Sequence, residues 1–393
     1  MKVIQKKSKV GERLFVKTLI PQIIGHGGSF MFWRLPDKDE KYLIVCNSGA
    51  TTQNEINLEG SKPGFAVAPF NPTLNKFFFS ADLIFKFKGE DLVEGPDLNN
   101  TKYNLHKENQ SQPGTEKIKM YYSKNPKGKY ANDYRRLVQE GMQQIESGSL
   151  EKIVPSTVNE IDLPENFEVL KTFYLFCEKH PKAFVSFISS PETGTWLGAS
   201  PELLVSVEGD KFRTIALAGT LPYQQEINLK SVAWTQKEIE EQALVCRYII
   251  NCFKKIRVRE YAEHGPRTVV AGRLLHLCTD YEVDMKEVNF PQLGSVMLKL
   301  LHPTSAVCGM PLEPALDFLR KNEGYDREFY SGYLGPVNFE GESRLFVNLR
   351  CIQILEKTAR IYAGAGVTAD SDPQQEAEEV AMKIQTLSQI INP

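Results

Sequence analysis

The residues best suited to chemistry lie near the end of the chain, in the segment RIYAGAGVTADSDPQQEAEEVAMK. An apolar run there leads into Gly364 and Gly366, and a polar turn follows before a helical pattern begins. Glycines let backbone N–H groups approach an anion closely, and the start of a helix adds a positive end. The segment predicts either an anion-binding turn or an ordinary tight turn, and the residues alone leave both open.

Carboxylates follow this turn on one face of the predicted helix. Glu376 and Glu379 are three residues apart, and Lys383 lies one turn further along. Glu241 belongs to a second acidic group in another helical pattern. Mg²⁺ binds through one or two carboxylates and keeps sites for water and substrate. A magnesium site with one glutamate from each helix is therefore possible, and the alternative is a pair of solvated acidic helix faces.

Two further side chains are candidates for proton transfer. Lys152 precedes the apolar pair Ile153 and Val154, so it either points into the fold, where a desolvated amine can act as a base, or lies at a strand edge. Glu202 follows Pro201 between two predicted strands and either protonates a leaving hydroxyl or simply begins a strand. His276 alternates with apolar residues, which is typical of a hydrogen-bonded core histidine.

Composition excludes several classes of protein. The net charge of −2 gives no reason to expect a nucleic acid or an anionic membrane as partner. The seven cysteines form no CxxC pair, which favours a reducing compartment, and we expect a cytoplasmic protein. We find no apolar window of about 18 residues for a membrane span, and the basic N-terminus lacks the apolar core of a signal peptide.

Runs of strands between helices predict an α+β fold with antiparallel sheets. A polar span from about 94 to 130 suggests an internal boundary, so we divide the chain into 1–130, which contributes strands to a common fold, and 131–393, the catalytic region. We expect strands at 41–46, 64–68, 77–88, 152–155, 183–189, 195–199, 203–208, 212–218, 268–271, 274–278, 281–288, 330–339, 344–355 and 359–364, and helices near 132–148, 164–181, 231–258 and 373–391 and on both sides of the loop 302–311.

Several segments, taken together and in order, resemble the chorismate-utilising enzymes, a family that includes isochorismate, salicylate, anthranilate and aminodeoxychorismate synthases. The matching segments cover roughly residues 130 to 393 and are LEKIVPS (150–156), WLGASPELL (196–204), IALAGT (215–220), TQKEIEEQALV (235–245), LHPTSAVCGMP (301–311), DREFYSGYLGP (326–336), LFVNLR (345–350) and IYAGAG…SDPQQEAEE…K (361–383). The resemblance implies two antiparallel sheets packed face to face, with helices outside.

The resemblance also implies roles for individual residues. Glu241 and Glu379 match Mg²⁺ ligands, and Glu376 matches a residue that assists through water. The positions that match contacts to the substrate are Arg350, Tyr330 and Lys383, with backbone at Gly219, Gly364 and Gly366, together with His302 near the ring and Thr220 beside the glycine.

Three positions indicate which reaction the resemblance implies. Lys152 matches the lysine that activates water in isochorismate and salicylate synthases, and Glu202 matches the general acid. Ala218 stands where aminodeoxychorismate synthases carry a nucleophilic lysine. The resemblance therefore implies an isomerase of the isochorismate synthase type that acts on chorismate with Mg²⁺. No attached glutaminase domain is visible, so we expect no glutaminase subunit, and apart from the resemblance we expect a monomer.

Two alternatives stay open at this stage. A salicylate synthase would share this site and then eliminate pyruvate. A non-catalytic homologue would bind chorismate without turnover. Isochorismate feeds menaquinone and siderophore biosynthesis alike, and the sequence does not separate these pathways.

Overall fold

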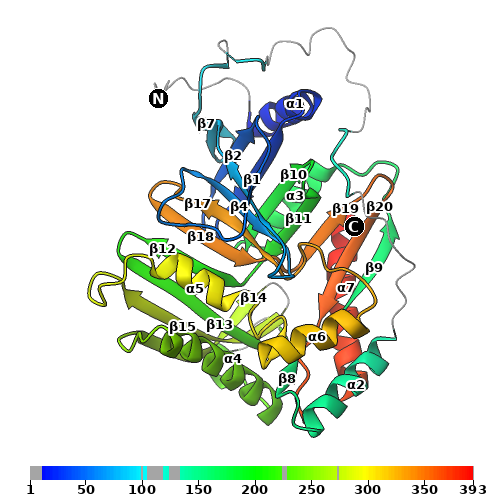
Figure 1. Ribbon diagram of the computed structural model, residues 1–393. Coiled ribbons are helices and arrows are strands. Elements are labelled where there is room, and N and C mark those ends of the chain that lie inside the picture. The colour runs from blue at the N-terminus through cyan, green and yellow to red at the C-terminus, as the bar shows by residue number, and fades with distance from the viewer. Residues whose placement is uncertain are drawn as a thin grey trace.

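Two large antiparallel sheets form the centre of the molecule (Figure 1). The computed structural model describes residues 11–98, 101–103, 118–123, 133–223, 228–271 and 274–392. The first sheet has the order β7 (Asp91–Glu94), β6 (Leu83–Lys88), β2 (Glu40–Cys46), β1 (Ser29–Arg34), β10 (Phe184–Ser190), β11 (Gly194–Ser200), β19 (Cys351–Ile354), β20 (Thr358–Gly364), β9 (Ser156–Asp162). The second has the order β14 (Ala262–Ala271), β15 (Leu274–Asp284), β13 (Lys211–Pro222), β12 (Leu203–Glu208), β18 (Glu342–Val347), β17 (Tyr333–Val337), β4 (Gly64–Ala68), β5 (Lys76–Ser80), β3 (Thr51–Gln53).

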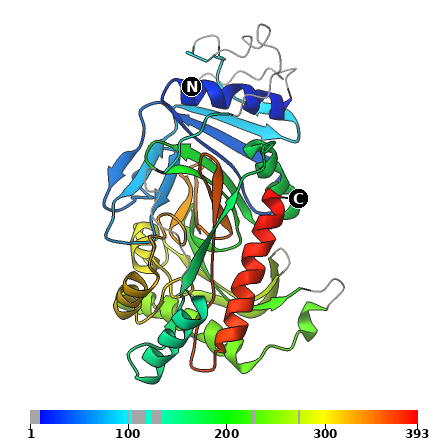
Figure 2. The same ribbon diagram turned by 90° about the vertical axis from the view of Figure 1, so that its right-hand side faces the viewer.

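Helices cover the outer faces of both sheets. They are α1 (Glu12–Gly25), α2 (Tyr134–Glu146), α3 (Val169–Lys179), α4 (Gln236–Lys255), α5 (Leu293–Leu301), α6 (Leu312–Asn322) and α7 (Pro373–Ile391), and a small ribbon pairs β8 (Lys152–Ile153) with β16 (Gly309–Met310). Figure 1 places α1 against β1 and α4 beneath β13 and β15. Figure 2 shows α7 running along one side of the molecule, where it packs on β20 and α2. This architecture confirms the expected α+β class with two antiparallel sheets.

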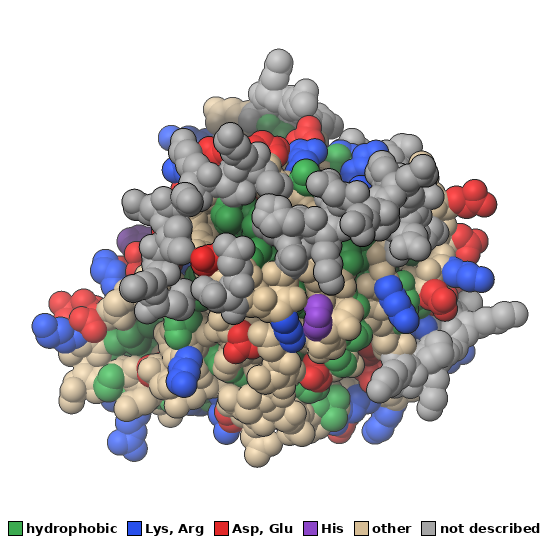
Figure 3. Space-filling model, turned by 90° about the horizontal axis from the view of Figure 1, so that it is seen from above, with side chains coloured by type: hydrophobic (Ala, Val, Ile, Leu, Met, Phe, Trp, Pro, Cys, Tyr) green, Lys and Arg blue, Asp and Glu red, His purple; other side chains and the backbone are tan. Residues whose placement is uncertain are grey.

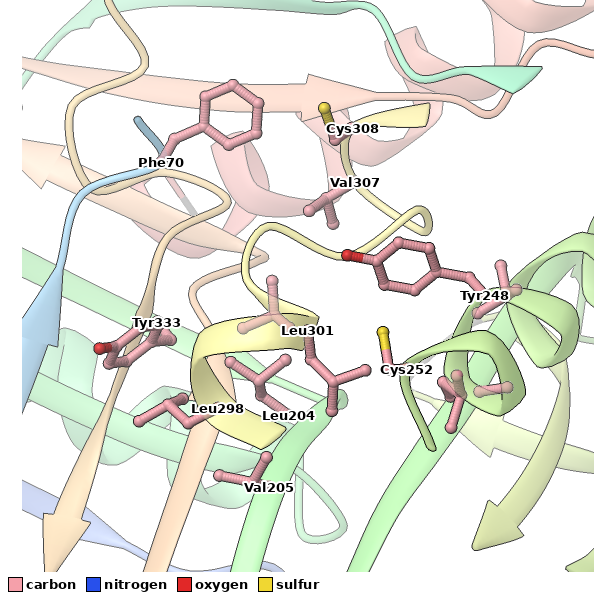
Figure 4. Close-up of a cluster of buried hydrophobic side chains, with 14 of the residues drawn as sticks. Phe70, Leu204, Val205, Tyr248, Cys252, Leu298, Leu301, Val307, Cys308 and Tyr333 are labelled. Atoms are coloured by element: carbon pink, nitrogen blue, oxygen red, sulfur yellow. The ribbon is translucent and has the colours of Figure 1, made fainter. Parts of the chain in front are cut away.

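The apolar residues form three buried layers. Aromatic residues between the sheets join them, since Phe184 of β10 stacks on Phe346 of β18 with ring centroids 4.3 Å apart. A second layer lies between the first sheet and helices α1 and α3. The third lies between the second sheet and α4, α5 and α6, and Figure 4 shows the part of it where Leu298 and Leu301 of α5 lie beside Leu204 of β12. Val307 at the edge of that layer also borders the candidate site.

The expectation that residues before 98 form only strands was wrong, because α1 occupies Glu12–Gly25. Its buried residues Phe15, Val16, Leu19, Ile20 and Ile23 do recur at helical spacing. Pro21 lies inside the helix and obscures that pattern, since proline usually ends a helix.

The expected single strand at 344–355 was also wrong. The structure divides it into β18, in the second sheet, and β19, in the first. Arg350 between them has φ +49°, a left-handed conformation that ends strand geometry. The apolar pattern runs through this break because both halves are buried, although in different sheets.

Smaller differences between the expected and observed strands concern where strands begin and end and which strands were not expected. The expected strand at 77–88 is two strands, β5 and β6, with a turn at Ala81 and Asp82. The expected pair 274–278 and 281–288 is one strand, β15, because the polar Thr279 and Asp280 continue the ladder with β13. The strands that were not expected are β1, β3, β7, β9 and β16.

The surface and the cysteines add little that is specific. In Figure 3 the acidic and basic side chains of the described residues are interspersed on the face shown. None of the described helices is both long and apolar enough to cross a membrane. All seven cysteines are free thiols.

A buried arginine ties together segments that border the candidate site. Arg327 donates hydrogen bonds to the carbonyls of Val307 (2.8 Å) and Val154 (2.7 Å) and forms an ion pair with Glu323. The side chains of Arg327 and Glu323 are 2 % and 3 % exposed, so the pair is desolvated. Removing one partner of such a pair leaves an uncompensated buried charge.

Arg327→Met should lower the free energy of unfolding by about 3–5 kcal/mol, because Glu323 would keep its burial and lose its counter-charge. Chemical denaturation measures this change. The matched control is Arg320→Met on α6, whose side chain is 44 % exposed and which should cost under about 1 kcal/mol. Equal stability of the two variants would contradict the structural role of the buried pair.

Candidate active site

A cavity opens beside the places where the chain passes from one sheet to the other. β11 of the first sheet leads into β12 of the second through Pro201 and Glu202, and β18 leads back to β19 through Arg350. Residues of both crossings line the cavity, together with the bulge of β13 and the turn between β20 and α7. Of the predicted site residues, the structure brings to this cavity Glu202, Gly219, Thr220, Glu241, Tyr330, Arg350, Gly364, Gly366, Glu379 and Lys383.

Glu202 is a buried carboxyl group that faces the cavity. Burial raises the pKa of Glu202 to about 8, although the nearby charge of Lys152 lowers it. A carboxyl group with this pKa holds its proton near neutral pH and can donate it. Of the two possibilities for Glu202, the structure therefore supports a proton donor more than a simple strand start.

Lys152 lies directly behind the cavity wall. Its side chain is 0 % exposed, and Nζ lies 2.9 Å from Oε1 of Glu241, which does line the cavity. Gly366 leaves room for this pair, since a Cβ there would lie 2.1 Å from Oε1 of Glu241 and 3.1 Å from Cε of Lys152. The interpretation of Lys152 as a lysine at an exposed strand edge is thereby excluded.

The three glutamates of the acidic group in α4 have different surroundings. Glu238 caps the helix with Thr235, and the exposed Glu240 accepts a hydrogen bond from Gln236. Only Glu241 faces the cavity. Burial opposes its ionisation, but Lys152, followed by Lys237 and Lys383, holds the pKa of Glu241 below its ordinary value.

The glutamates of α7 are also paired with lysines. Glu379, at the cavity, lies 2.7 Å from Nζ of Lys383, and the buried Glu376 lies 2.6 Å from Nζ of Lys237. Burial raises the pKa of Glu376, and Lys237 opposes that rise. Burial opposes the charge of Lys237, but the charges of Glu376, Glu241 and Glu379 all raise its pKa.

The carboxylates fit a hard divalent cation in their chemistry. Glu241 and Glu379 supply oxygen donors to one cavity from two helices, which is the number of protein carboxylates that Mg²⁺ ordinarily takes. Within the described part of the chain, no group of three His, Cys, Asp or Glu side chains has the spacing of a complete metal site. Any ion would therefore complete its shell with water or substrate.

Arg350 and His276 form a hydrogen-bonded pair at the cavity. Nη2 of Arg350 lies 2.8 Å from Nε2 of His276, and Nη1 donates to the carbonyl of Ala271 at 2.7 Å. Nδ1 of His276 lies 2.7 Å from the carbonyl oxygen of Gly219. Burial lowers the pKa of Arg350 to about 10, so the guanidinium keeps its charge near neutral pH. His276 is hydrogen-bonded, as expected, but it also lines the cavity.

The structure does not bring His302 to the cavity. Its Nε2 lies 2.9 Å from the carbonyl of Pro69, and its ring packs edge-on against Tyr333. Glu376 and Lys152 likewise lie outside the cavity lining, although Glu241, the ion-pair partner of Lys152, does line the cavity. Lys383, which lines it, also donates to the carbonyl of Gly364 at 2.9 Å.

Two functional candidates escaped the sequence analysis. Lys237 was not predicted as a site residue. In the structure its ammonium group interacts with the charges of Glu376 and Glu241. His180, at the end of α3, lines the cavity, and burial lowers its pKa to about 4. Lys237 and Glu241 are four residues apart on α4, but the ion pair of Lys237 with Glu376 joins two helices that are far apart in the sequence. No local pattern marks His180.

Comparisons with known proteins agree with this geometry. A family model described as chorismate binding enzyme matches residues 87–392. Isochorismate synthase DhbC of Bacillus subtilis is 31 % identical over 268 residues, which cover 65 % of this chain and 66 % of that protein. Isochorismate synthase EntC of Escherichia coli is 29 % identical over 214 residues, which cover 53 % and 54 %. The match thus spans about two thirds or less of these relatives' lengths.

A solved structure shares the whole fold. MenF, the menaquinone-specific isochorismate synthase from Escherichia coli, superposes with a TM-score of 0.75 at 18 % identity, covering 99 % of this chain and 94 % of that one. At this identity the likeness shows a common fold.

The raised pKa of Glu202 has a measurable effect on stability. In the unfolded chain its proton dissociates near the ordinary value of 4.5, but in the folded protein near 8. The folded state thus binds more protons between these values, and stability falls by about 1.4 kcal/mol per pH unit as pH rises through the window.

Glu202→Gln removes this dependence, so the variant should gain stability relative to the wild type when pH rises from 5 to 8. Chemical denaturation at several pH values measures the difference. The exposed Glu165→Gln is the control and should show a constant difference. A pH-independent difference for Glu202→Gln as well would mean that Glu202 is ionised throughout.

Proposed function

The chain belongs to the chorismate-binding enzyme family, and we propose that it is an isochorismate synthase, which adds a hydroxyl group from water at C2 of chorismate and releases the C4 hydroxyl as water. The observation that carries the proposal is that a protonated carboxyl group, Glu202, lines the same cavity as Glu241, the ion-pair partner of the buried Lys152. Water is the nucleophile in this reaction, and it needs one group to accept its proton and another to protonate the leaving hydroxyl.

The cavity has the charges to hold a dicarboxylate. Arg350 and Lys383 are cations at its wall, and Tyr330 and the backbone of Gly364 and Gly366 lie beside them. A guanidinium presents a rigid fork of donors that matches a carboxylate. These residues would orient the ring so that its C2 and C4 positions lie toward the two proton-transfer groups.

Glu241 and Glu379 are the proposed ligands of Mg²⁺, with Glu376 assisting through water. The bound ion would draw electron density toward the ring carboxylate of the substrate. Lys237 and Lys383 pair with two of these glutamates and would balance their charge when the cation is absent.

The proton steps use residues of this chain alone. Lys152 would accept a proton from the attacking water, and for this its amine must first give up its own proton and leave the ion pair with Glu241. Glu202 gives its proton to the hydroxyl that leaves C4 on the opposite side. The raised pKa of Glu202 makes that transfer favourable near neutral pH.

We also propose the remaining features of the enzyme. Residues 1–130 act as scaffold, and 131–393 carry the catalytic groups. The enzyme works in the cytoplasm as a monomer without a glutaminase subunit. Salicylate synthase is the alternative activity, because it would use the same Lys152 and Glu202.

Lys152→Ala and Glu202→Gln should each lower turnover of chorismate by about 100- to 10,000-fold, since each removes one proton-transfer group. Affinity for chorismate, measured by calorimetry, should change far less. Product analysis should find isochorismate in the wild type.

The controls are the exposed Lys171→Ala and Glu165→Gln, which should keep wild-type rates. Wild-type turnover by either active-site variant would refute the mechanism. Salicylate and pyruvate as wild-type products would establish the alternative activity instead.

Glu241→Gln and Glu379→Gln should raise the Mg²⁺ concentration for half-maximal turnover by at least about tenfold, because each loses a charged ligand. Chelation should stop the wild type, and Mg²⁺ should restore it. Glu378→Gln, the exposed neighbour on α7, should behave as wild type. An unchanged Mg²⁺ requirement in both ligand variants would contradict the proposed metal site.

A further inference from the structure

A bulge in β13 lies opposite His276. The strands β13 and β15 pair regularly up to Ala218 and Leu277 and resume at Leu221 and Leu275. Gly219 and Thr220 are therefore looped out, and Gly219 takes φ +67°. A bulge re-aims the backbone, and here it brings the Gly219 carbonyl within 2.7 Å of the imidazole.

The two partners of His276 determine its tautomer. A guanidinium only donates hydrogen bonds, so Nε2 facing Arg350 at 2.8 Å must be the unprotonated acceptor. A carbonyl only accepts, so Nδ1 facing Gly219 must carry the proton. The ring is thus neutral, and a second proton would set an N–H group against the guanidinium.

We infer that His276 is a positioning residue, which locks Arg350 in the orientation that binds a substrate carboxylate and ties it to the bulge at Gly219. Arg350 has five N–H groups, and the hydrogen bonds within the described residues use two of them, one to His276 and one to the Ala271 carbonyl. Three N–H groups of a fixed fork are left for a ligand. The inference rests on the proposed function insofar as that ligand is chorismate.

The surroundings keep the imidazole in this neutral form. The side chain is buried, and burial lowers the pKa of His276 to about 3, with the charges of Arg350 and Lys383 acting in the same direction. A histidine that stays neutral across the working pH range can accept from arginine at all times. A carboxylate in its place would neutralise Arg350 and compete with the substrate, so a neutral acceptor suits this position.

Three substitutions separate the two hydrogen bonds. His276→Gln places an amide oxygen near the position of Nε2 and keeps an acceptor for Arg350. His276→Asn keeps a donor near the position of Nδ1 but removes that acceptor, and His276→Leu removes both. The exposed His264→Gln on β14 is the matched control.

We expect His276→Asn and His276→Leu to weaken chorismate binding by about 10- to 100-fold, the usual effect of a lost hydrogen bond to a charged group. KM should rise with little change in kcat, since the carboxylate is held equally in the ground and transition states. His276→Gln and the control should stay within about threefold of wild type. A merely structural role would not produce this split or this rescue.

Nitrogen-15 NMR of the wild type should show the neutral Nδ1–H tautomer of His276, whether or not substrate binds. An Nε2–H or charged ring would overturn the inference, and so would equal affinities of the Gln, Asn and Leu variants. If the wild type neither binds nor converts chorismate, the proposed function fails, while the tautomer still decides whether His276 holds Arg350 as described.

Discussion

The candidate site depends on one constraint, that two of the crossings of the chain between its sheets, β11 to β12 and β18 to β19, lie side by side. The crossings are held together by backbone hydrogen bonds from Val347 to Glu202 (3.0 Å) and from Ala199 to Arg350 (3.2 Å). Strands pair on both sides of each crossing, so neither can slide without breaking two ladders. An acid and a cation that are far apart in sequence are therefore fixed on one wall, and the left-handed backbone at Arg350 is maintained by that double pairing.

Charge balance is the second organising feature of the site. Three buried or half-buried glutamates at the site each have a lysine partner, namely Lys152 for Glu241, Lys237 for Glu376 and Lys383 for Glu379. Such pairs avoid the cost of burying single charges. Glu202, which has no ion pair within 4 Å among the described residues, instead keeps its proton. The same cavity thus combines carboxylates in ion pairs, the proposed ligands of a cation, with a protonated carboxyl group, the proposed proton donor.

The sequence predicted what depends on local pattern and on motifs. The last helix was predicted at 373–391, as observed, because Asp372 caps it and Pro373 begins it. The break at Arg350 was not predictable. The alternation of apolar residues indicates that a strand is buried, but it does not indicate to which sheet the strand belongs. Likewise His276 was expected in the core, but only the fold brings the bulge at Gly219 and the crossing at Arg350 to its two nitrogens. His302 was expected near the substrate, and the structure places it against Pro69 and Tyr333.

The lysine–glutamate pairs also bear on how such a site can change through evolution. Two of the pairs join different elements, β8 to α4 and α4 to α7. Replacing one member of a pair leaves its partner charged and poorly hydrated. A substitution at Lys152 therefore lowers the stability of the fold, whatever it does to the choice of nucleophile. Exchange of Lys152, the proposed water-activating residue, therefore requires a compensating change at Glu241 or a cation that takes over its charge. Epistasis of this kind restricts the order in which substitutions at the site can accumulate.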